Sequence, residues 1–363
     1  MTTPLQEQIE QVVSTYHDEL LGTTLGHARA LQSIRLDGHR AVIEIQLGFP
    51  VNSHGPKLAA AIKQAVEALP GVREAQVEVT AEIIAHSAKL KASRIQSIKN
   101  IIAVASGKGG VGKSTVAANL ALALAAEGAC VGMLDADIYG PSQPRMLGVK
   151  GRPTSDDGRH FAPMRSYSVQ SMSVGYLVEE DEPTVWRGPM VTQALTQLLN
   201  DTRWGNLDYL IVDMPPGTGD IQLTLSQNVP VSGAVIVTTP QDIATLDARK
   251  GLQMFRKVNV PILGIVENMS LQICAHCGHE GHPFGEGGGR QVAEQYGVTL
   301  LGELPLDTVI REAADGGRPT VVADPDGPAA QRFTETALRM AAKLSLQAKD
   351  YTRKPPMIKV EAT

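Results

Sequence analysis

Apolar and polar residues are spaced in two different ways along this chain. In residues 1–85 helical and strand periods follow one another within a short length. The pattern predicts a helix over "PLQEQIEQVVSTYHDELL", a strand pair around "ARALQSIRLDGHRAVIEIQLGF", a helix over "PKLAAAIKQAVEAL" and a strand in "VREAQVEVTAEI". We therefore expect a small α+β domain over residues 1–85.

From Ile101 onward, short apolar runs alternate with helical stretches. The runs read "NIIAVAS", "CVGMLD", "DYLIVDMP", "AVIVTTP", "PILGIVEN" and "TLLGELPL". Near-continuous apolar strands separated by helices are typical of a parallel sheet that is buried on both faces. The pattern predicts an α/β fold with a mostly parallel, doubly wound sheet over residues 100–345. Cys130, in the second run, is expected to be a small buried core residue.

Two less regular segments flank the predicted sheet domain. Residues 86–99 contain basic residues and no acidic one. Such a stretch could contact nucleic acid, but a solvated basic linker is the favoured interpretation. Residues 346–363 contain two consecutive prolines and are expected to form an extended C-terminal tail.

Composition narrows the class of protein. The 363 residues carry a formal net charge of −5, which argues against a general binder of nucleic acid or of anionic membranes. No start resembles a secretory signal, and no apolar run approaches the ~20 residues that span a bilayer. We expect a cytoplasmic protein. Three cysteines in a chain of this length do not indicate a disulfide framework.

The stretch "ASGKGGVGKST" contains the pattern G-x-x-x-x-G-K-[ST] between a predicted strand and a predicted helix. In such a loop, backbone N–H groups and a helix N-terminus surround phosphate groups. Lys113 would neutralise the β- and γ-phosphates, and the Ser114 hydroxyl would hold Mg²⁺. The expected nucleotide contacts are Gly107, Lys108, Gly109, Gly110, Val111, Gly112, Lys113, Ser114 and Thr115. Lys108 is not needed by this pattern, and it could be a solvent-facing loop lysine.

Carboxylates follow two of the apolar strands, where a P-loop needs them. Asp213 ends "DYLIVD" and would hold Mg²⁺ directly or through water. Asp135 and Asp137 end the strand after the P-loop helix. One of them can join the water shell of the metal and the other can orient the attacking water, although both could instead be helix caps. The segment Pro215–Asp220 can rearrange when the γ-phosphate leaves.

Asn268 closes the apolar strand "GIVEN" and is a candidate contact to a purine edge. Its side-chain amide can both donate and accept hydrogen bonds. The N-K-x-D pattern of guanine-specific GTPases is absent, which favours ATP over GTP.

Cys274 and Cys277 form a C-x-x-C shortly after that strand. Two thiolates at this spacing can bind one metal ion or cluster, but they supply two ligands rather than four. Three interpretations follow: nearby histidines complete a zinc site within the chain, two chains donate two cysteines each to a cluster, or the pair is a redox motif. The histidines in question are His276, His279 and His282.

Several motifs together resemble one family. "GKGGVGKST" is similar to the deviant Walker A motif of the MinD, ParA and nitrogenase-reductase ATPases. "LDADIYGPSQPRMLG", "WRGPM", "DYLIVDMPPGTGDIQLTLSQ", "TTPQDIATLDARKG" and "GIVENMS" resemble the Mrp/ApbC iron–sulfur cluster carrier ATPases, over roughly residues 100–344. The resemblance implies that Lys108 reaches the partner's nucleotide across a homodimer, and that Cys274 and Cys277 share a [4Fe–4S] cluster on the dimer axis.

The first domain resembles the small domain of iron–sulfur assembly proteins. It departs from that domain in two places: "HDELLG" stands where Asp-Pro-Glu is common, and "FPVNSH" lacks a cysteine found in some members. We therefore assign it only an interaction or scaffold role.

The expected function is an ATP-hydrolysing carrier that delivers iron–sulfur clusters to apoproteins and works with cluster assembly factors. Alternatives are a MinD/ParA-like positioning ATPase, a zinc-binding P-loop ATPase and a nitrogenase-reductase-like electron donor. A MinD-like positioning ATPase would need a terminal basic amphipathic helix, which this chain does not show. A nitrogenase-reductase-like donor would need two well-separated cluster cysteines, and the cysteines here do not match that arrangement. Asn268 and Cys274 are six residues apart, at most ~20 Å of chain, so nucleotide and cluster could be coupled.

Overall fold

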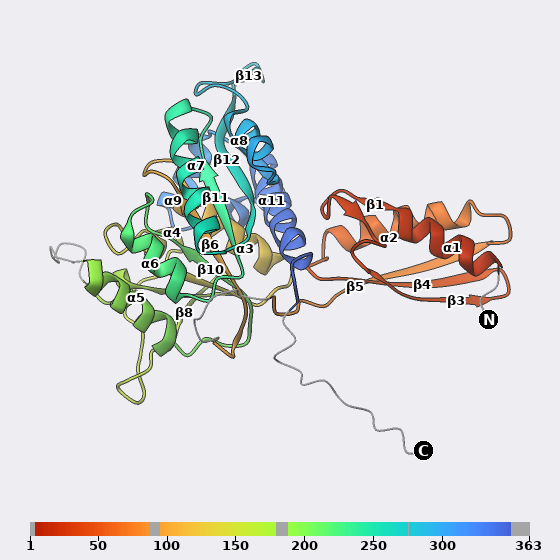
Figure 1. Ribbon diagram of the computed structural model, residues 1–363, viewed down its shortest axis with the longest axis horizontal. Coiled ribbons are helices and arrows are strands. Elements are labelled where there is room, and N and C mark those ends of the chain that lie inside the picture. The colour runs from red at the N-terminus through yellow and green to blue at the C-terminus, as the bar shows by residue number, and fades with distance from the viewer. Residues whose placement is uncertain (1–3, 87–94, 179–187, 275, 350–363) are drawn as a thin grey trace.

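The structure, a computed structural model, describes residues 4–86, 95–178, 188–274 and 276–349. The central part of the predicted linker, 87–94, and the tail from residue 350 lie outside the described residues, as does part of the "WRGPM" motif. Figure 1 shows a small domain and a larger domain that meet near the C-terminal end of the last helix. Within the described residues, no helix combines the length and apolar character needed to cross a bilayer.

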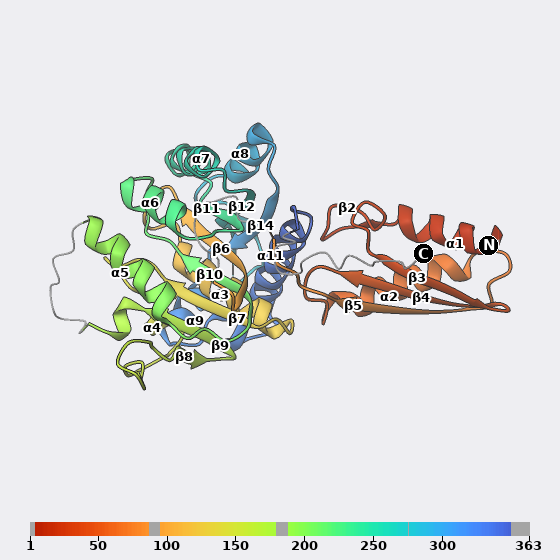
Figure 2. The same cartoon turned by 60° about the horizontal axis from the view of Figure 1, so that its bottom comes forward.

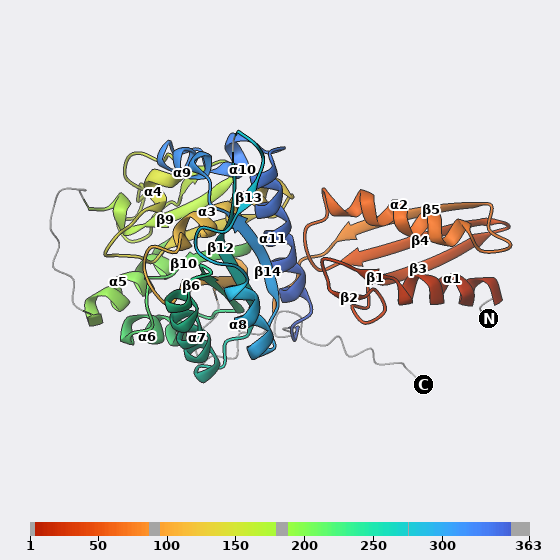
Figure 3. The same ribbon diagram turned by 90° about the horizontal axis from the view of Figure 1, so that it is seen from above.

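The small domain is a three-stranded sheet with two helices on one face (Figures 1 and 3). The central strand β4 pairs antiparallel with β3 and parallel with β5. Its alternate side chains are buried beneath the helices, as the period-two pattern predicts. The elements are α1 (Pro4–Thr15), β1 (His17–Asp18), β2 (Thr23–Thr24), β3 (Leu31–Asp37), β4 (Arg40–Leu47), α2 (His54–Glu67) and β5 (Glu74–Ala81).

The first helix is shorter than its sequence pattern predicts. It ends at Thr15 rather than continuing through "YHDELL". The Asp18 carboxylate accepts the backbone N–H groups of Leu20 and Leu21, at 3.0 and 2.9 Å. These local bonds replace the helical ones, because an aspartate can satisfy the backbone two and three residues ahead of itself.

The large domain is built on a nine-stranded sheet in the order β13-β12-β11-β6-β10-β7-β9-β8, with β14 also paired to β12. All of its pairings are parallel except those of β8 and β13. The predicted doubly wound α/β fold is therefore confirmed. The strands are β6 (Ile98–Ser106), β7 (Val131–Asp135), β8 (Met164–Ser166), β9 (Val169–Ser173), β10 (Leu207–Asp213), β11 (Gly233–Thr238), β12 (Ile262–Ile273), β13 (Glu280–Gly281) and β14 (Leu300–Pro305).

Helices cover both faces of this sheet (Figure 2). Along β6, Ile102 and Val104 face one helical layer, while Ile101 and Ala103 face the other. This explains why the strands read as continuous apolar runs. The helices are α3 (Lys113–Ala126), α4 (Gln143–Met146), η1 (Val174–Tyr176), α5 (Gly188–Asp201), α6 (Asp220–Asn228), α7 (Asp242–Lys257), α8 (Gly288–Tyr296), α9 (Thr308–Asp315), α10 (Thr320–Ala323) and α11 (Pro328–Ser345).

The two domains are joined at the ends of α3 and α11. The backbone N–H of Ser53 donates to the Glu127 carboxylate, just beyond the end of α3, at 2.9 Å. Lys343 of α11 donates to the carbonyl of Leu21 at 3.0 Å. The small domain thus contacts the end of α3 opposite the glycine loop.

Candidate functional site

The carboxyl ends of three neighbouring strands bring polar side chains to one level. In the register of the parallel sheet, Asp213 of β10 is paired with Asp135 of β7, and Asp135 with Ser173 of β9. Val104 of β6 is paired with Asp213, so the glycine loop that follows β6 begins beside the same carboxylates. The sheet therefore brings together residues far apart in sequence, at the edge where such folds bind ligands.

The glycine loop runs from Gly107 to Gly112 and turns directly into α3. Two of its glycines are required by close packing. A Cβ on Gly107 would lie 2.2 Å from the backbone of Asp247 in α7, and one on Gly112 would lie 2.2 Å from the Asn268 amide nitrogen. Gly112 also has a φ of 79°, which favours glycine. Gly109 and Gly110 are exposed, as residues that line an open phosphate site should be.

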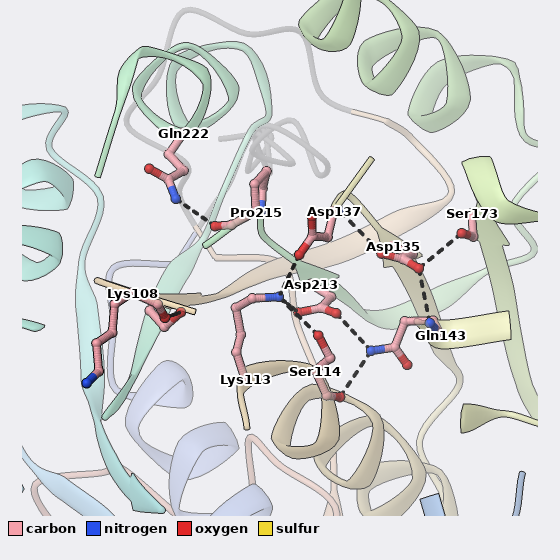
Figure 4. A network of polar contacts seen from close by, with 11 residues as sticks. Lys108, Lys113, Ser114, Asp135, Asp137, Gln143, Ser173, Asp213, Pro215 and Gln222 are labelled. Atoms are coloured by element: carbon pink, nitrogen blue, oxygen red, sulfur yellow. Dashed lines mark hydrogen bonds and ion pairs between the residues drawn. The ribbon is translucent and has the colours of Figure 1, made fainter. Parts of the chain in front are cut away.

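Lys113 opens α3 and is buried among carboxylates (Figure 4). Its ammonium group forms an ion pair with Asp213 and lies 3.9 Å from Asp137. It also donates to the Ser114 hydroxyl at 3.2 Å. Thr115 lies in the same first turn and is partly exposed. The predicted lysine, serine and two of the predicted aspartates therefore lie together.

Asp135 is fully buried, and its pKa is raised to about 7. Burial is the main cause, and the negative charge of Asp213 adds to it. The backbone N–H of Gln143 and the hydroxyl of Ser173 both donate to its Oδ2 atom, at 3.1 and 3.0 Å. Burial also raises the pKa of Asp137, against the opposing effect of Lys113. Neither aspartate occupies the N-cap position of a helix, but Asp135 accepts the N–H of Gln143, the first residue of α4.

Gln143 is a residue of this site that sequence reasoning missed. Its side-chain NH₂ donates to Asp213 Oδ2 at 2.9 Å and to the backbone carbonyl of Ser114 at 3.0 Å. It is fully buried, and its Oε1 atom has no hydrogen-bond partner. Gln143 thus links Asp135, Asp213 and the P-loop helix. Its sequence signals were a position eight residues after Asp135 and a place within the family motif "LDADIYGPSQPRMLG", neither of which specifies the contact.

The donor set at this site fits Mg²⁺. The ammonium group of Lys113 lies against the carboxylates of Asp137 and Asp213, and a third carboxylate, that of Asp135, is paired in register with Asp213 on the neighbouring strand. A divalent cation would compensate this excess of negative charge. Among the described residues, no group of three His, Cys, Asp or Glu side chains could hold a metal ion alone. Mg²⁺ here would take ligands from nucleotide phosphates and water as well as Ser114, as is usual for this ion.

Lys108 does not join this cluster. Figure 4 shows its side chain pointing away from Lys113 and the aspartates, and it is partly exposed. The segment predicted to rearrange lies close by. The N–H of Gly217 donates to the carbonyl of Ser106 at 3.0 Å, and Gln222 donates to the carbonyl of Pro215. The segment is therefore held against the end of β6 by few bonds.

Asn268 is buried in β12 and contacts the glycine loop. Its amide donates to the backbone carbonyl of Val111 at 2.9 Å. The second amide hydrogen and the carbonyl oxygen remain available for a ligand. The purine contact stays a prediction, but the residue lies beside the phosphate loop, as that role requires.

Cys274 and Cys277 lie at the end of a hairpin formed by β12 and β13, and both are exposed. The hairpin end is closed by Cys274 N–H donating to the His279 carbonyl, and Gly278 N–H donating to the Cys274 carbonyl, both at 2.9 Å. Backbone N–H groups of Cys277 and His276 lower the pKa of the Cys274 thiol. This geometry favours a thiolate.

The prediction for Cys130 was wrong. This residue is exposed and precedes β7, which begins at Val131. Its backbone N–H donates to Asp208 at 2.8 Å. The apolar run suggested a buried strand, but its first residue, Cys130, lies at the surface just before the amino-terminal end of β7.

A strand that leads through a glycine loop into a helix, with a buried lysine beside strand-end aspartates, defines a P-loop nucleoside triphosphatase. Comparison with known proteins identifies the family. Residues 97–341 match the family described as NUBPL iron-transfer P-loop NTPase, and residues 6–79 match the family described as iron–sulfur cluster assembly protein. The chain belongs to the iron-transfer P-loop NTPase family, which confirms the resemblance predicted from its motifs.

Similar curated proteins carry matching names. An iron–sulfur cluster carrier protein of Haemophilus influenzae is 48% identical over 348 residues, which are 96% of this chain and 94% of the relative. The carrier protein of Pseudomonas fragi is 58% identical over 76% of this chain and 97% of its own length. The iron–sulfur cluster transfer protein NUBPL of Mus musculus is 52% identical over 70% of this chain and 80% of its own length.

Solved structures resemble the large domain. A nucleotide-binding protein from Archaeoglobus fulgidus, in complex with ADP, is 37% identical with a TM-score of 0.58, covering 66% of this chain and 93% of that one. The cell division ATPase MinD of Pyrococcus furiosus is 23% identical with a TM-score of 0.50, covering 66% of this chain and 98% of that one. The second likeness shows the fold alone.

Proposed function

We propose that this protein carries iron–sulfur clusters to acceptor apoproteins, and that ATP binding and hydrolysis by a homodimer switch the cargo between held and released states. The carrying observation is that one chain combines a complete phosphate loop with an exposed C-x-x-C hairpin on the strand that contacts that loop. The names of relatives that span the whole chain support the same function.

In this proposal the nucleotide site works with residues of known position. Lys113 would exchange its ion pair with Asp213 for the β- and γ-phosphates of a bound nucleotide, and the Asp213 carboxylate would then be available to hold Mg²⁺, directly or through water. Asp137, at the open side of the cluster, orients the attacking water. Bound Mg²⁺ would supply charge compensation for the phosphates, with Ser114 as its protein ligand.

Lys108 acts in trans. It points away from its own aspartates, so within one chain it has no contact with the charge that hydrolysis develops. In a homodimer it would reach the partner's nucleotide and stabilise that charge, as an arginine finger does.

The cluster is the cargo, and Cys274 and Cys277 are its proposed ligands. One chain supplies two exposed thiols, and two chains supply the four that a [4Fe–4S] cluster requires. The lowered pKa of Cys274 favours the thiolate that binds iron. All three cysteines are free, which agrees with the proposed cytoplasmic location. The small domain would contact assembly factors or acceptors.

Anaerobic reconstitution with iron and sulfide tests the carrier function. Wild type is compared with the double variant Cys274→Ser/Cys277→Ser, and Cys130→Ser is the matched control because its thiol is equally exposed. We expect visible absorption, iron and a dimeric mass in wild type and in the control, and none of the three in the double variant. A colourless wild type that instead retains stoichiometric zinc would contradict the proposal.

Mixed dimers test the trans role of Lys108. Lys108→Ala and Lys113→Ala subunits are each expected to be inactive alone. When they are mixed, one nucleotide site per dimer combines an intact Lys113 with the partner's Lys108, so ATPase activity should return. If mixing restores nothing although the subunits exchange, Lys108 serves its own chain.

A further inference from the structure

Strand β12 contacts the glycine loop through Asn268 and continues into the cysteine hairpin. Between these two points, its regular pairing with β14 is interrupted. Its pairing with β14 shifts register: Glu267 is paired with Glu303, but the next pair is Leu271 with Pro305. Four residue steps on β12 therefore face two on β14. Such a bulge bends a strand and re-aims the side chains that follow it. The interruption covers residues 268–270, which we call the β12 bulge.

Met269, in the centre of the β12 bulge, has a φ of 58°. The left-handed region is unfavourable for a bulky residue, by on the order of 1–3 kcal/mol, and such residues occur where the surroundings enforce them. Here the surroundings include the phosphate loop. The Met269 methyl carbon lies 3.7 Å from the position that a Cβ on Gly112 would occupy. Its neighbour Asn268 donates to the carbonyl of Val111.

The hairpin side of the β12 bulge is held by different bonds. The Ser270 hydroxyl donates to the Leu304 carbonyl at 3.2 Å. The Ser270 carbonyl accepts a hydrogen bond from Nδ1 of His282, at 2.8 Å, and His282 lies just after β13. Asn268 thus bonds to the phosphate loop, the Met269 methyl group lies on the side of Gly112 where a Cβ would be, and Ser270 bonds to the base of the cysteine hairpin.

Glu267, the residue just before the β12 bulge, bonds to neither the phosphate loop nor the cysteine hairpin but to α8. Glu267 is fully buried and accepts the backbone N–H of Gly289, at the start of α8. It fixes β12 to α8 immediately before the bulge. Beyond the bulge, the chain is paired with β13 through Gln272 and Ile273 before it reaches Cys274. The β12 bulge is therefore where the strand passes from a fixed segment to an exposed hairpin.

We propose that the β12 bulge is the positioning element that couples the nucleotide loop to the cysteine hairpin, with Met269 as its pivot. Phosphate binding fixes the backbone of Val111, to which Asn268 is bonded, and of Gly112, beside which the Met269 methyl group lies. A change there alters the backbone angles at the already strained Met269, and the hairpin that carries both cysteines turns with it. This inference deepens the proposed function, but its test does not require a cluster.

Hydrogen exchange of the full-length protein measures the coupling directly. Backbone amides of residues 272–281 are followed with and without a saturating non-hydrolysable ATP analogue. We expect the analogue to slow their exchange about 10-fold in wild type, within the usual range of coupling between sites. Met269→Gly, which relieves the strained φ, should reduce the effect to less than about 2-fold. Met269→Ala, which keeps the strain but removes the side chain that lies beside Gly112, is the second variant.

The matched control is Asn259→Gly. Asn259 also has a φ of 58° and precedes β12, but it lies in the turn after α7, away from the loop. It should leave the 10-fold effect intact. Analogue affinity is measured for every variant, so that lost binding is not mistaken for lost coupling.

Retention of the full effect in both Met269 variants overturns the inference, as does its loss in Asn259→Gly. Loss in either Met269 variant, with the control intact and the analogue bound, supports it. If wild type couples in this way yet never assembles a cluster, the proposed function fails and the inference stands.

Discussion

The two domains treat a buried aspartate in opposite ways. In the small domain, Asp18 accepts two backbone N–H groups and forms a 2.7 Å hydrogen bond with Nε2 of His54. Burial raises its pKa, but the bonds from His54 and the backbone outweigh burial and lower it. In the large domain, Asp135 accepts three hydrogen bonds, from the N–H groups of Asp137 and Gln143 and the hydroxyl of Ser173. Its pKa is nevertheless raised to about 7, because burial is reinforced by the charge of Asp213.

The difference separates a structural site from a functional one. Around Asp18 each charge has its partner, and the site holds the β1–β2 turn against the start of α2. Around Asp135 the protein keeps more negative charge than it compensates, and it leaves Gln143 Oε1 buried without a partner. A fold tolerates such an imbalance where a ligand will correct it. This imbalance supports the proposal that the nucleotide site takes up Mg²⁺ and phosphate, whereas the Asp18 site is complete.

Among the substitutions that test this comparison, Lys113→Ala is expected to lower the free energy of unfolding most. It removes the ammonium group that lies against Asp137 and Asp213, and leaves Asp213 buried without its ion partner, which costs about 3–5 kcal/mol. Urea unfolding without nucleotide, followed by tryptophan fluorescence, measures the loss, because Trp204 is buried in the large domain.

Lys108→Ala is the control for that measurement, since Lys108 is in the same loop but outside the cluster. It should leave the unfolding free energy within about 0.5 kcal/mol of wild type, as surface substitutions usually do. Equal losses in the two variants would show that Lys113 has no special role in balancing the apo site.

Asp18→Ala should have the next largest effect, and in the other domain. It leaves the N–H groups of Leu20 and Leu21 and the ring of His54 without their acceptor, at a cost of about 2–3 kcal/mol. Faster hydrogen exchange in α1 and α2 reports this loss. ATPase activity and the tryptophan transition should change little. A marked loss of ATPase activity in Asp18→Ala would mean that the Asp18 site has a functional role as well as a structural one.

Much of the nucleotide site could be predicted from the sequence because its chemistry follows from local patterns. Lys113 and Ser114 are fixed by a contiguous loop, and Asp135 and Asp213 by the ends of parallel strands. The order of the elements and the apolar runs were also enough to predict the sheet. Where a residue's role depends on spacing along one strand or loop, the sequence contains it.

Contacts that depend on packing between distant segments were not predicted. Gln143 lies 70 residues from Asp213, and nothing in its own neighbourhood indicates the bond. The β12 bulge adds residues to a strand that reads as regular. Cys130 was placed wrongly because an apolar run does not show where a strand leaves the surface. The turn at Asp18, by contrast, could have been recognised from an aspartate near a helix end.

Gln143→Leu tests the large-domain network with a smaller effect. It keeps the volume but removes the two side-chain donor bonds, one of them to the Asp213 carboxylate, which is worth about 1.5–2 kcal/mol. We expect the apparent affinity for Mg²⁺ in the presence of ATP to fall about 10-fold, because Asp213 loses the bond that orients it. Titration of Mg²⁺ at fixed nucleotide measures it. Gln193→Leu on the surface of α5 is the control, and an unchanged Mg²⁺ response in Gln143→Leu would remove Gln143 from the network.

The smallest expected effect is the response of the small domain to acid, and its sign follows from Asp18. Its folded pKa is below the ordinary value of 3.8, so its ionised form stabilises the fold above that pH. This contribution is lost as pH falls below about 4 through the folded pKa. His54→Asn removes a partner that lowers the pKa of Asp18, so the stabilisation by ionised Asp18 should begin to be lost at a higher pH. Hydrogen exchange of the α2 amides from pH 5 to pH 3 measures this loss. His39, exposed in the same domain, offers the control His39→Asn, which should follow wild type. If both variants follow wild type, then His54 does not complete the Asp18 site, and the contrast with Asp135 rests on the backbone bonds alone.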